Sequence, residues 1–295
     1  MTPPGSSELP NDPDRSSRPK RARSKLTAFL LVAVAIYLGL VLVMVLFEKR
    51  LVYPGAYYPE GFGTPYAVLE DVESVTYPST DDIRLTGRLL ERRGSAALVL
   101  YFHGNGTKAV WLDDWIAHLG LTLNATVMAA ELRGFEDDHT PTERGVIEDA
   151  FAARDYLCER YGIMPSDIVL YGRSLGGGLA AALAASDGAQ ALVLERTFDQ
   201  LVRVGATKFP WLPVRLVMRN RFDSAARLAD FRGPVLQIHG TADQIVPIER
   251  GRALFSSLQT QVKRFIEVPG LGHNDSIPDD VLEQLALWLA ALDEA

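Results

Sequence analysis

Hydrophobic and polar residues follow two different patterns along this chain. Residues 27–47 form an apolar run without a charged side chain, whereas from about residue 66 onward short apolar runs alternate with segments of helical periodicity. Continuous apolar runs of about four to eight residues are typical of strands buried on both faces of a parallel sheet. The longer part of the chain therefore predicts an α/β domain, with helices on both faces of a mainly parallel sheet.

Strands and helices are expected to alternate within residues 66–295. Two segments with period-two alternation, 68–77 and 83–90, predict a half-exposed hairpin. Buried strands are expected at 96–102, 125–130, 167–171, 191–194, 235–239 and 264–268. Helices are expected at 110–119, 176–185 and 281–292. A further helix is predicted to open at Thr140-Pro141-Thr142-Glu143, which has the form of a capping box with proline at the first helical position.

The apolar run at 27–47 has the length of a membrane span. As an α-helix, its 21 residues extend about 31 Å, close to the bilayer core of about 30 Å. A buried core helix would normally be shorter and would have a polar stripe. A signal peptide would have an apolar run of about 7–15 residues before a cleavage site of small residues. The sequence therefore predicts an uncleaved signal-anchor, a transmembrane helix at 26–47 that binds the membrane through residues 27–47.

The two flanks of this span differ in composition. Residues 1–25 contain six basic and three acidic side chains among many prolines and serines, and predict a disordered basic tail. Because more basic residues precede the span than follow it directly, the N-terminus is expected in the cytoplasm and the main domain outside it. Residues 48–65, rich in proline and glycine, are expected to form a juxtamembrane tether to the domain at 66–295.

Charge and cysteine content narrow the function classes. The net charge is −7, and since residues 1–25 carry +3, the other 270 residues sum to −10. Such an acidic domain argues against a nucleic-acid partner. The only cysteine, Cys158, leaves no intrachain disulfide and no metal cluster of several thiolates. No metal or organic cofactor is expected, and nothing indicates an oligomeric state.

The segment Gly172-Arg173-Ser174-Leu175-Gly176 lies between an expected strand and an expected helix. G-x-S-x-G in this context is the turn that exposes a nucleophilic serine above a sheet. Side chains larger than hydrogen at 172 and 176 would collide with neighbouring backbone in such a turn. The motif alone occurs by chance in about one protein in ten of this length, and a glycine-rich turn with a solvated serine is the alternative. Its placement predicts Ser174 as the nucleophile.

An acid and a base are expected downstream, in the order serine, carboxylate, histidine. Asp243 follows the expected strand 235–239, and His273 follows the last expected strand. His273 is the only histidine after Asp243. It can take the serine proton as a base, while a carboxylate fixes its tautomer. Helix caps or solvated charges account for the other nearby carboxylates, Asp223, Asp230, Glu249, Glu267 and Asp275. Structural or surface positions are expected for His239, His118 and His139.

The segment His103-Gly104-Asn105-Gly106 follows the expected strand 96–102. A loop at this place can supply one backbone N–H to an oxyanion, while the residue after the nucleophile supplies the other. The predicted donors are therefore Asn105 and Leu175, with Gly104 and Gly106 permitting close approach of the backbone. A glycine-rich turn in which His103 is purely structural is the alternative.

Together these motifs resemble the α/β-hydrolase superfamily over residues 66–295. The matching segments are HGNG at 103–106, GRSLGGG at 172–178, HGTADQIVP at 239–247 and GLGH at 270–273. The chain is similar to membrane-anchored members related to serine-aminopeptidase-like and depalmitoylase-like hydrolases, which have a segment resembling Leu51-Val52-Tyr53-Pro54 after an N-terminal helix. The resemblance implies an α/β-hydrolase fold with a short helical cap, and a Ser174–Asp243–His273 triad. Where relatives often have an Asp-Tyr-Arg-Gly-like stretch, this chain has Glu131-Leu132-Arg133-Gly134-Phe135, which we interpret as structural.

The expected function is hydrolysis of carboxylic esters or thioesters through an acyl-enzyme, with a small-molecule or lipid acyl substrate. About 40 residues separate the strands expected at 191–194 and 235–239, which leaves room for a small cap. Its apolar residues either pack on the core or form an acyl pocket or a lipid-facing surface. Two alternatives stay open: a serine peptidase, and a non-catalytic domain that binds lipid or a partner. The fold does not identify the substrate.

Overall fold

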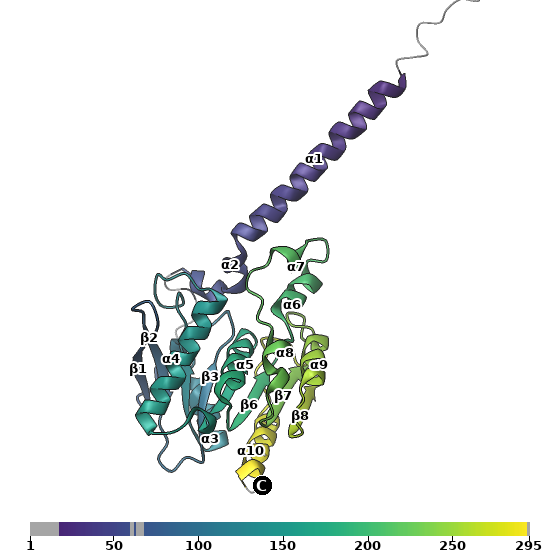
Figure 1. Cartoon of the computed structure of the whole chain (residues 1–295). Helices are drawn as coiled ribbons and strands as arrows, with labels where there is room; N and C mark the ends of the chain where they lie inside the picture. Colours follow the sequence, from purple (N-terminus) through teal and green to yellow (C-terminus); the bar gives the residue numbers. More distant parts are fainter. Residues whose placement is uncertain (1–17, 60–61, 63–67, 294–295) are drawn as a thin grey trace, which may run out of the picture. The chain divides into compact units, whose positions relative to one another are not determined.

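The computed structural model describes residues 18–59, 62 and 68–293, which fall into two compact units. The first unit ends at Phe47 and the second begins at Glu48. Within the first unit, α1 (Arg18–Leu46) is a single helix (Figure 1). Its segment Lys25–Leu46 has a mean hydropathy of 3.0 and contains no buried residue, so it is long and apolar enough to cross a membrane.

Part of the expected basic tail is helical. Residues 1–17 lie outside the described residues, but residues 18–25 form the first turns of α1 rather than a disordered segment. Arginine, lysine and alanine have high helix propensity, so the helix extends from the apolar run into its basic flank.

The second unit is built on an eight-stranded sheet in the order β1-β2-β4-β3-β5-β6-β7-β8. Figure 1 labels the strands β1, β2, β3, β6, β7 and β8 of this sheet. The strands are β1 (Val72–Pro78), β2 (Arg84–Leu90), β3 (Ala97–Phe102), β4 (Ala125–Ala130), β5 (Val169–Arg173), β6 (Ala191–Glu195), β7 (Val235–Gly240) and β8 (Lys263–Val268). β2 pairs antiparallel with β1 and with β4, and every other neighbouring pair is parallel. The predicted hairpin and mainly parallel sheet are confirmed.

Helices cover both faces of this sheet. The longer ones are α3 (Asp113–Leu123), α4 (Glu143–Tyr161), α5 (Leu175–Asp187), α9 (Ile248–Ser257) and α10 (Asp279–Asp293). The short segments between them are η2 (Ala109–Trp111), η3 (Pro165–Asp167), α6 (Leu201–Lys208), α7 (Val214–Val217), α8 (Ser224–Arg227) and η4 (Leu228–Asp230). The cap expected between β6 and β7 is thus made of α6, α7, α8 and η4.

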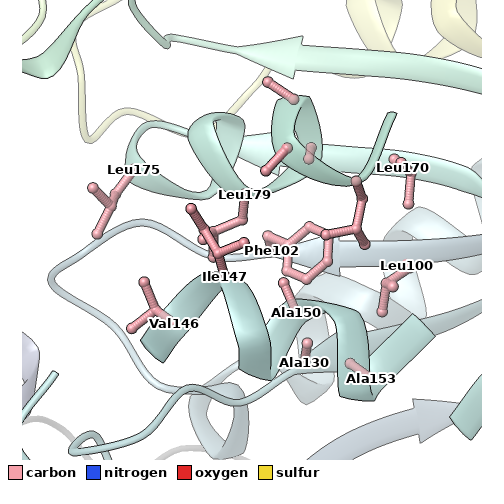
Figure 2. Packing of buried hydrophobic residues seen from close by; sticks show 14 of the residues in the cluster. Leu100, Phe102, Ala130, Val146, Ile147, Ala150, Ala153, Leu170, Leu175 and Leu179 are labelled. Carbon is pink, nitrogen blue, oxygen red and sulfur yellow. The ribbon is translucent and has the colours of Figure 1, made fainter. Parts of the chain in front are cut away.

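The core divides according to the alternation of side chains along each strand. In β3, Leu100 and Phe102 belong to a cluster on one face that also contains residues of α4, α5 and α9, whereas Val99 and Tyr101 belong to a cluster on the other face with residues of α3 and α10. Figure 2 shows the first of these clusters, where residues of α4 and α5 meet β3 and β5. The contacts from α4 come from residues three or four apart, which lie on one side of a helix.

Two predicted helix starts are shifted. α4 begins at Glu143, and its N-cap is Thr142, whose hydroxyl accepts from the backbone N–H of Gly145 at 3.1 Å. The expected cap at Thr140 is therefore wrong by two residues, and the capping box is not formed with Glu143, whose carboxylate accepts from the N–H of Arg221. The helix expected from residue 110 is preceded by η2 and begins at Asp113.

The first part of the expected tether is folded into the second unit. Residues 48–57 form α2 (Glu48–Val52) and η1 (Pro54–Tyr57), and Glu48, Val52 and Tyr53 are buried. The carboxylate of Glu48 accepts hydrogen bonds from the backbone N–H groups of Arg219 and Asn220. Local composition indicated a loop, but contacts with residues more than 160 positions away order the segment.

Candidate active site

The carboxyl ends of β5, β7 and β8 bring the predicted site residues to one edge of the sheet. Ser174 is the single residue between β5 and α5, and it has φ 53° and ψ −115°. A positive φ is strained for a serine and is typical of functional turns. A Cβ at Gly172 would overlap the backbone of Gly176, and one at Gly176 would overlap the backbone of Phe102. Both glycines are therefore required for this turn to form.

Ser174, His273 and Asp243 form one hydrogen-bonded chain. His273 Nε2 lies 3.0 Å from Ser174 Oγ, and His273 Nδ1 lies 2.7 Å from Asp243 Oδ2. All three side chains are buried, with residue exposures of 6 to 9%. In this arrangement the imidazole can accept the hydroxyl proton on one nitrogen while the carboxylate holds the proton on the other.

Asp243 is held as an ionised acceptor. Its Oδ1 accepts from the N–H groups of Ile245 and Val246 at 2.9 and 2.8 Å. Burial opposes ionisation, but hydrogen bonds from His239 and His273 outweigh it and hold the pKa of Asp243 well below its usual range. His239 is the penultimate residue of β7, and its Nε2 lies 2.9 Å from the carbonyl of Val246, so this histidine fixes the loop that presents Asp243.

A second, buried network holds the loop that carries His273. Arg196 donates from Nη1 to the carbonyls of Gly272 and Asp275 at 2.8 and 2.7 Å. Arg173, from the G-x-S-x-G segment, donates to the carbonyl of His273 at 3.0 Å. Both guanidinium groups contact the buried carboxylate of Glu195, at 3.2 Å from Arg173 and 3.0 Å from Arg196.

Glu195 connects this network to the nucleophile. Its carbonyl accepts from the N–H of Ser174 at 2.8 Å, and its Oε2 accepts from the hydroxyl of Tyr171 at 2.7 Å. Burial would raise the pKa of Glu195, but the charges of Arg173 and Arg196 outweigh it and lower that pKa. The same burial, with the nearby carboxylate, raises the pKa of Tyr171 well above its usual value. Sequence reasoning did not single out Glu195 or Arg196.

The predicted oxyanion loop passes next to Ser174. A Cβ at Gly104 would lie 3.6 Å from Ser174 Cβ, a normal van der Waals distance. Both the backbone and the side chain of Asn105 are bonded to the segment before the domain sheet. Its carbonyl accepts from Gly55 N–H and its Nδ2 donates to the carbonyl of Val52, each at 2.9 Å. Within the described residues, no acceptor is paired with the N–H of Asn105 or of Leu175.

Glu131 fixes the two ends of this loop. Its Oε1 lies 3.2 Å from His103 Nε2, and its Oε2 accepts from the N–H of Ala109 at 2.8 Å. The carboxylate is buried, and its own backbone is bonded to the hydroxyl of Tyr77. The stretch beginning at Glu131 is therefore structural, as interpreted, and His103 is a structural partner of Glu131. Gly106 lies at the exposed end of the loop.

Apart from His239 and Asp275, the other candidate carboxylates and histidines form no hydrogen bond or ion pair with this hydrogen-bonded chain or its loops in the described part of the protein. Asp275 Oδ2 accepts from the N–H of Gly272, beside His273, at 2.7 Å. Asp223 caps α8 by accepting from Ala226 N–H, and Glu267 pairs with Arg252 on the surface. His118 pairs with the exposed Asp279, and the exposed His139 pairs with the partly buried Asp137. Among the described residues, no group of three or more histidine, cysteine, aspartate or glutamate side chains is placed to hold a metal ion.

Comparison with other sequences identifies the family to which this chain belongs. A model of the alpha/beta hydrolase fold matches residues 97–231, which include Ser174 but end before Asp243 and His273. An uncharacterized protein of Mycobacterium tuberculosis is 34% identical over 77% of this chain and 81% of its own length. Protein bem46 of Schizosaccharomyces pombe is 30% identical over 84% of this chain and 87% of its own length. The chain belongs to the α/β-hydrolase family.

Solved structures agree with this assignment at the level of fold. An alpha-beta hydrolase from Vibrio vulnificus superposes with a TM-score of 0.65 and 21% identity, over 83% of this α/β hydrolase and 92% of that chain. The esterase domain of a Rhodothermus marinus protein gives a TM-score of 0.57 and 21% identity, and the superposition covers 74% of this chain and 97% of that chain. The human alpha/beta hydrolase domain-containing protein 17B is 30% identical over 60% of each chain.

Proposed function

We propose that this α/β hydrolase is a membrane-anchored serine hydrolase that cleaves carboxylic esters or thioesters through an acyl-enzyme on Ser174. The observation that carries the proposal is the chain Ser174–His273–Asp243, with links of 3.0 and 2.7 Å. Several structures with the same fold are of esterases, including those from Rhodothermus marinus and Pyrococcus furiosus. This likeness supports ester hydrolysis as the first activity to test.

In the first half-reaction, Ser174 Oγ attacks the acyl carbonyl while His273 Nε2 takes the hydroxyl proton. The C–O bond to the serine forms, and the carbonyl oxygen becomes an oxyanion. The unpaired N–H groups of Asn105 and Leu175 are the proposed donors to that oxygen. Collapse of the tetrahedral intermediate breaks the bond to the alcohol or thiol, which leaves with the proton held by His273.

In the second half-reaction, water replaces the leaving group. His273 takes a proton from the water, the hydroxide attacks the acyl-enzyme, and the same two N–H groups stabilise the second oxyanion. Collapse releases the carboxylic acid and returns the proton to Ser174. Asp243 stays ionised throughout and stabilises the imidazolium that forms in each half-reaction. Each step uses only groups of this chain and water.

Membrane attachment is proposed through residues 27–47, of which all but Phe47 lie in α1. The length, the mean hydropathy of 3.0 and the exposure of this helix support an anchor. The proposed orientation, with the N-terminus in the cytoplasm and the catalytic unit outside it, is supported by the basic residues that precede the span.

The proposal is tested with the full chain in detergent micelles, by following hydrolysis of p-nitrophenyl esters across acyl chain lengths. Ser174→Ala should lower kcat/KM by about 10⁴- to 10⁶-fold, because the covalent route is removed. The matched control is Ser256→Ala, which changes an exposed serine on α9 and should leave the rate unchanged. Equal rates in wild type and Ser174→Ala would instead support a non-catalytic binding domain. A higher rate on peptide amides than on esters would support the peptidase.

A further inference from the structure

The cap contains a strongly basic segment in an otherwise acidic protein. Residues 201–221 include five basic side chains and no acidic one, so they carry +5 while the rest of the chain carries −12. We define the cap tip as residues 208–219, which join α6 to α7 and continue beyond it. Its basic residues are Lys208, Arg215 and Arg219, all exposed. Within the described residues, no carboxylate lies at salt-bridge distance from any of the three.

Large apolar side chains stand exposed among these charges. Leu216 is 86% exposed and Trp211 is 55% exposed. The other large apolar side chains of the tip are at least partly covered: Val214 is buried, and Met218 packs against the core. The apolar residues of the tip thus form two sets, one covered by the protein and one exposed to solvent. Only Trp211 and Leu216 form an exposed apolar surface here.

The cap tip is bonded to the first residue of the domain. Glu48 Oε1 accepts from the N–H groups of Arg219 and Asn220 at 2.9 and 2.8 Å, and from Asn220 Nδ2 at 2.8 Å. In the sequence, Glu48 comes two residues after Leu46, where the apolar span ends. The chain therefore leaves its proposed membrane segment close to the residues that hold the cap tip.

The cap tip also borders the candidate site. The ammonium group of Lys208 donates to the carbonyl of Gln244, the residue directly after Asp243. A molecule bound at Lys208 would therefore lie next to the loop that carries Asp243.

We propose that the cap tip docks onto the surface of an anionic lipid bilayer, with Trp211 and Leu216 inserted among the acyl chains and Lys208, Arg215 and Arg219 at the headgroups. Exposed aromatic and aliphatic residues flanked by basic ones fit the interface of such a bilayer, where each nearby basic residue contributes about 1 kcal/mol, which is about fivefold in binding. The inference rests on the proposed membrane attachment, and it is independent of catalysis at Ser174. Docking would place the loop that carries Asp243 next to a lipid surface.

The test uses an environment-sensitive NBD label on the full chain reconstituted in vesicles. Cys158→Ser removes the only native cysteine, and Leu216→Cys carries the label. In phosphatidylcholine vesicles containing phosphatidylglycerol, we expect blue-shifted emission that is quenched by nitroxide-labelled acyl chains. Arg215→Gln with Arg219→Gln should lower the ratio of docked to undocked tip by about thirtyfold. The matched control, Arg84→Gln with Arg93→Gln, removes two exposed arginines elsewhere and should have no effect.

A label at Leu287→Cys reports on a site away from the tip. Leu287 is 71% exposed on α10, and its label should stay water-like in every vesicle. A water-like signal at residue 216 in anionic vesicles would overturn the proposal. So would a blue shift that persists in detergent and grows with protein concentration, which would indicate a second copy of the chain. Extraction of the vesicles with alkaline carbonate tests the anchor separately. A chain without its membrane span would be released into the supernatant, whereas a chain anchored by residues 27–47 would stay with the vesicles, whatever the label at residue 216 reports.

Discussion

The carboxylate of Glu195 and the guanidinium of Arg196 are each about 1% exposed, and they bond both to each other and to the loops of the site. A buried charge is tolerated only with a partner, so replacing Glu195 would leave the Arg196 guanidinium without its counter-charge. Two adjacent charged residues after a strand are typical of a solvated loop, which is why the sequence did not reveal them. Ser174, Asp243 and His273 were predicted from a motif and an order along the chain, and the structure places the side chains of Ser174 and Asp243 within hydrogen-bond distance of His273.

Replacing Glu195 with glutamine should destabilise the fold by about 3–5 kcal/mol at neutral pH, because Arg196 loses its buried counter-charge. The pKa of Glu195 is lowered from 4.5 in the folded protein, so the stabilisation is complete above that pH and is lost as the pH falls below it. The difference between wild type and Glu195→Gln should therefore narrow on acidification. Urea unfolding of the full chain in micelles, followed by fluorescence at several pH values, measures it.

Glu267→Gln is the matched control, since it removes a glutamate that pairs with Arg252 on the surface. It should cost at most about 1 kcal/mol, because exposed ion pairs contribute little. Equal losses in the two variants, or a Glu195→Gln effect that stays constant from neutral to acidic pH, would contradict the role assigned to the buried pair.

At the scale of elements, strands were predicted well and short segments ordered by distant contacts were not. β3 was expected at 96–102 and forms at Ala97–Phe102, because its buried apolar run is a local property of the sequence. α2 and η1 were expected as tether, since Pro54 and Gly55 are loop signals. Their order comes from bonds to Asn220 and Asn105, which no local pattern contains.

Gly55→Ala tests whether η1 positions the oxyanion loop. A Cβ at Gly55 would lie 2.9 Å from the carbonyl oxygen of Asn105 and 2.8 Å from the Phe135 ring, so the loop has to shift. A shift of this kind should lower kcat by about tenfold to a hundredfold with little change in KM. The proposed N–H donor stabilises the oxyanion, which forms in the transition state and is absent from the bound substrate. Ester hydrolysis by the full chain gives both constants.

Gly39→Ala provides the control for this substitution, because nothing lies within 4 Å of a Cβ built at Gly39 in α1. It should leave kcat and KM unchanged. A Gly55→Ala protein that keeps wild-type kcat, or that loses activity only in proportion to the unfolded fraction, would show that η1 does not position the loop.

At the scale of the whole molecule, the fold and the three central side chains follow from the sequence, while the supporting network does not. The alternation of strands and helices predicts the sheet, and the parallel strands bring residues 174, 243 and 273 to one edge. The folded domain begins at Glu48 and not near residue 66, because long-range bonds recruit the segment after the span. The apolar run that predicts the anchor is a single helix, as expected.

The most direct test of the acyl-enzyme at Ser174 is covalent labelling of the full chain with a fluorophosphonate, mapped by tandem mass spectrometry. This reagent captures an activated serine, so the account predicts one phosphonylated site, Ser174, with labelling abolished in Ser174→Ala. His273→Ala should slow labelling by several orders of magnitude, on the order of 10⁴-fold or more, because the base that activates the hydroxyl is gone. Labelling at another residue, or no labelling of a folded wild-type chain, would contradict the account.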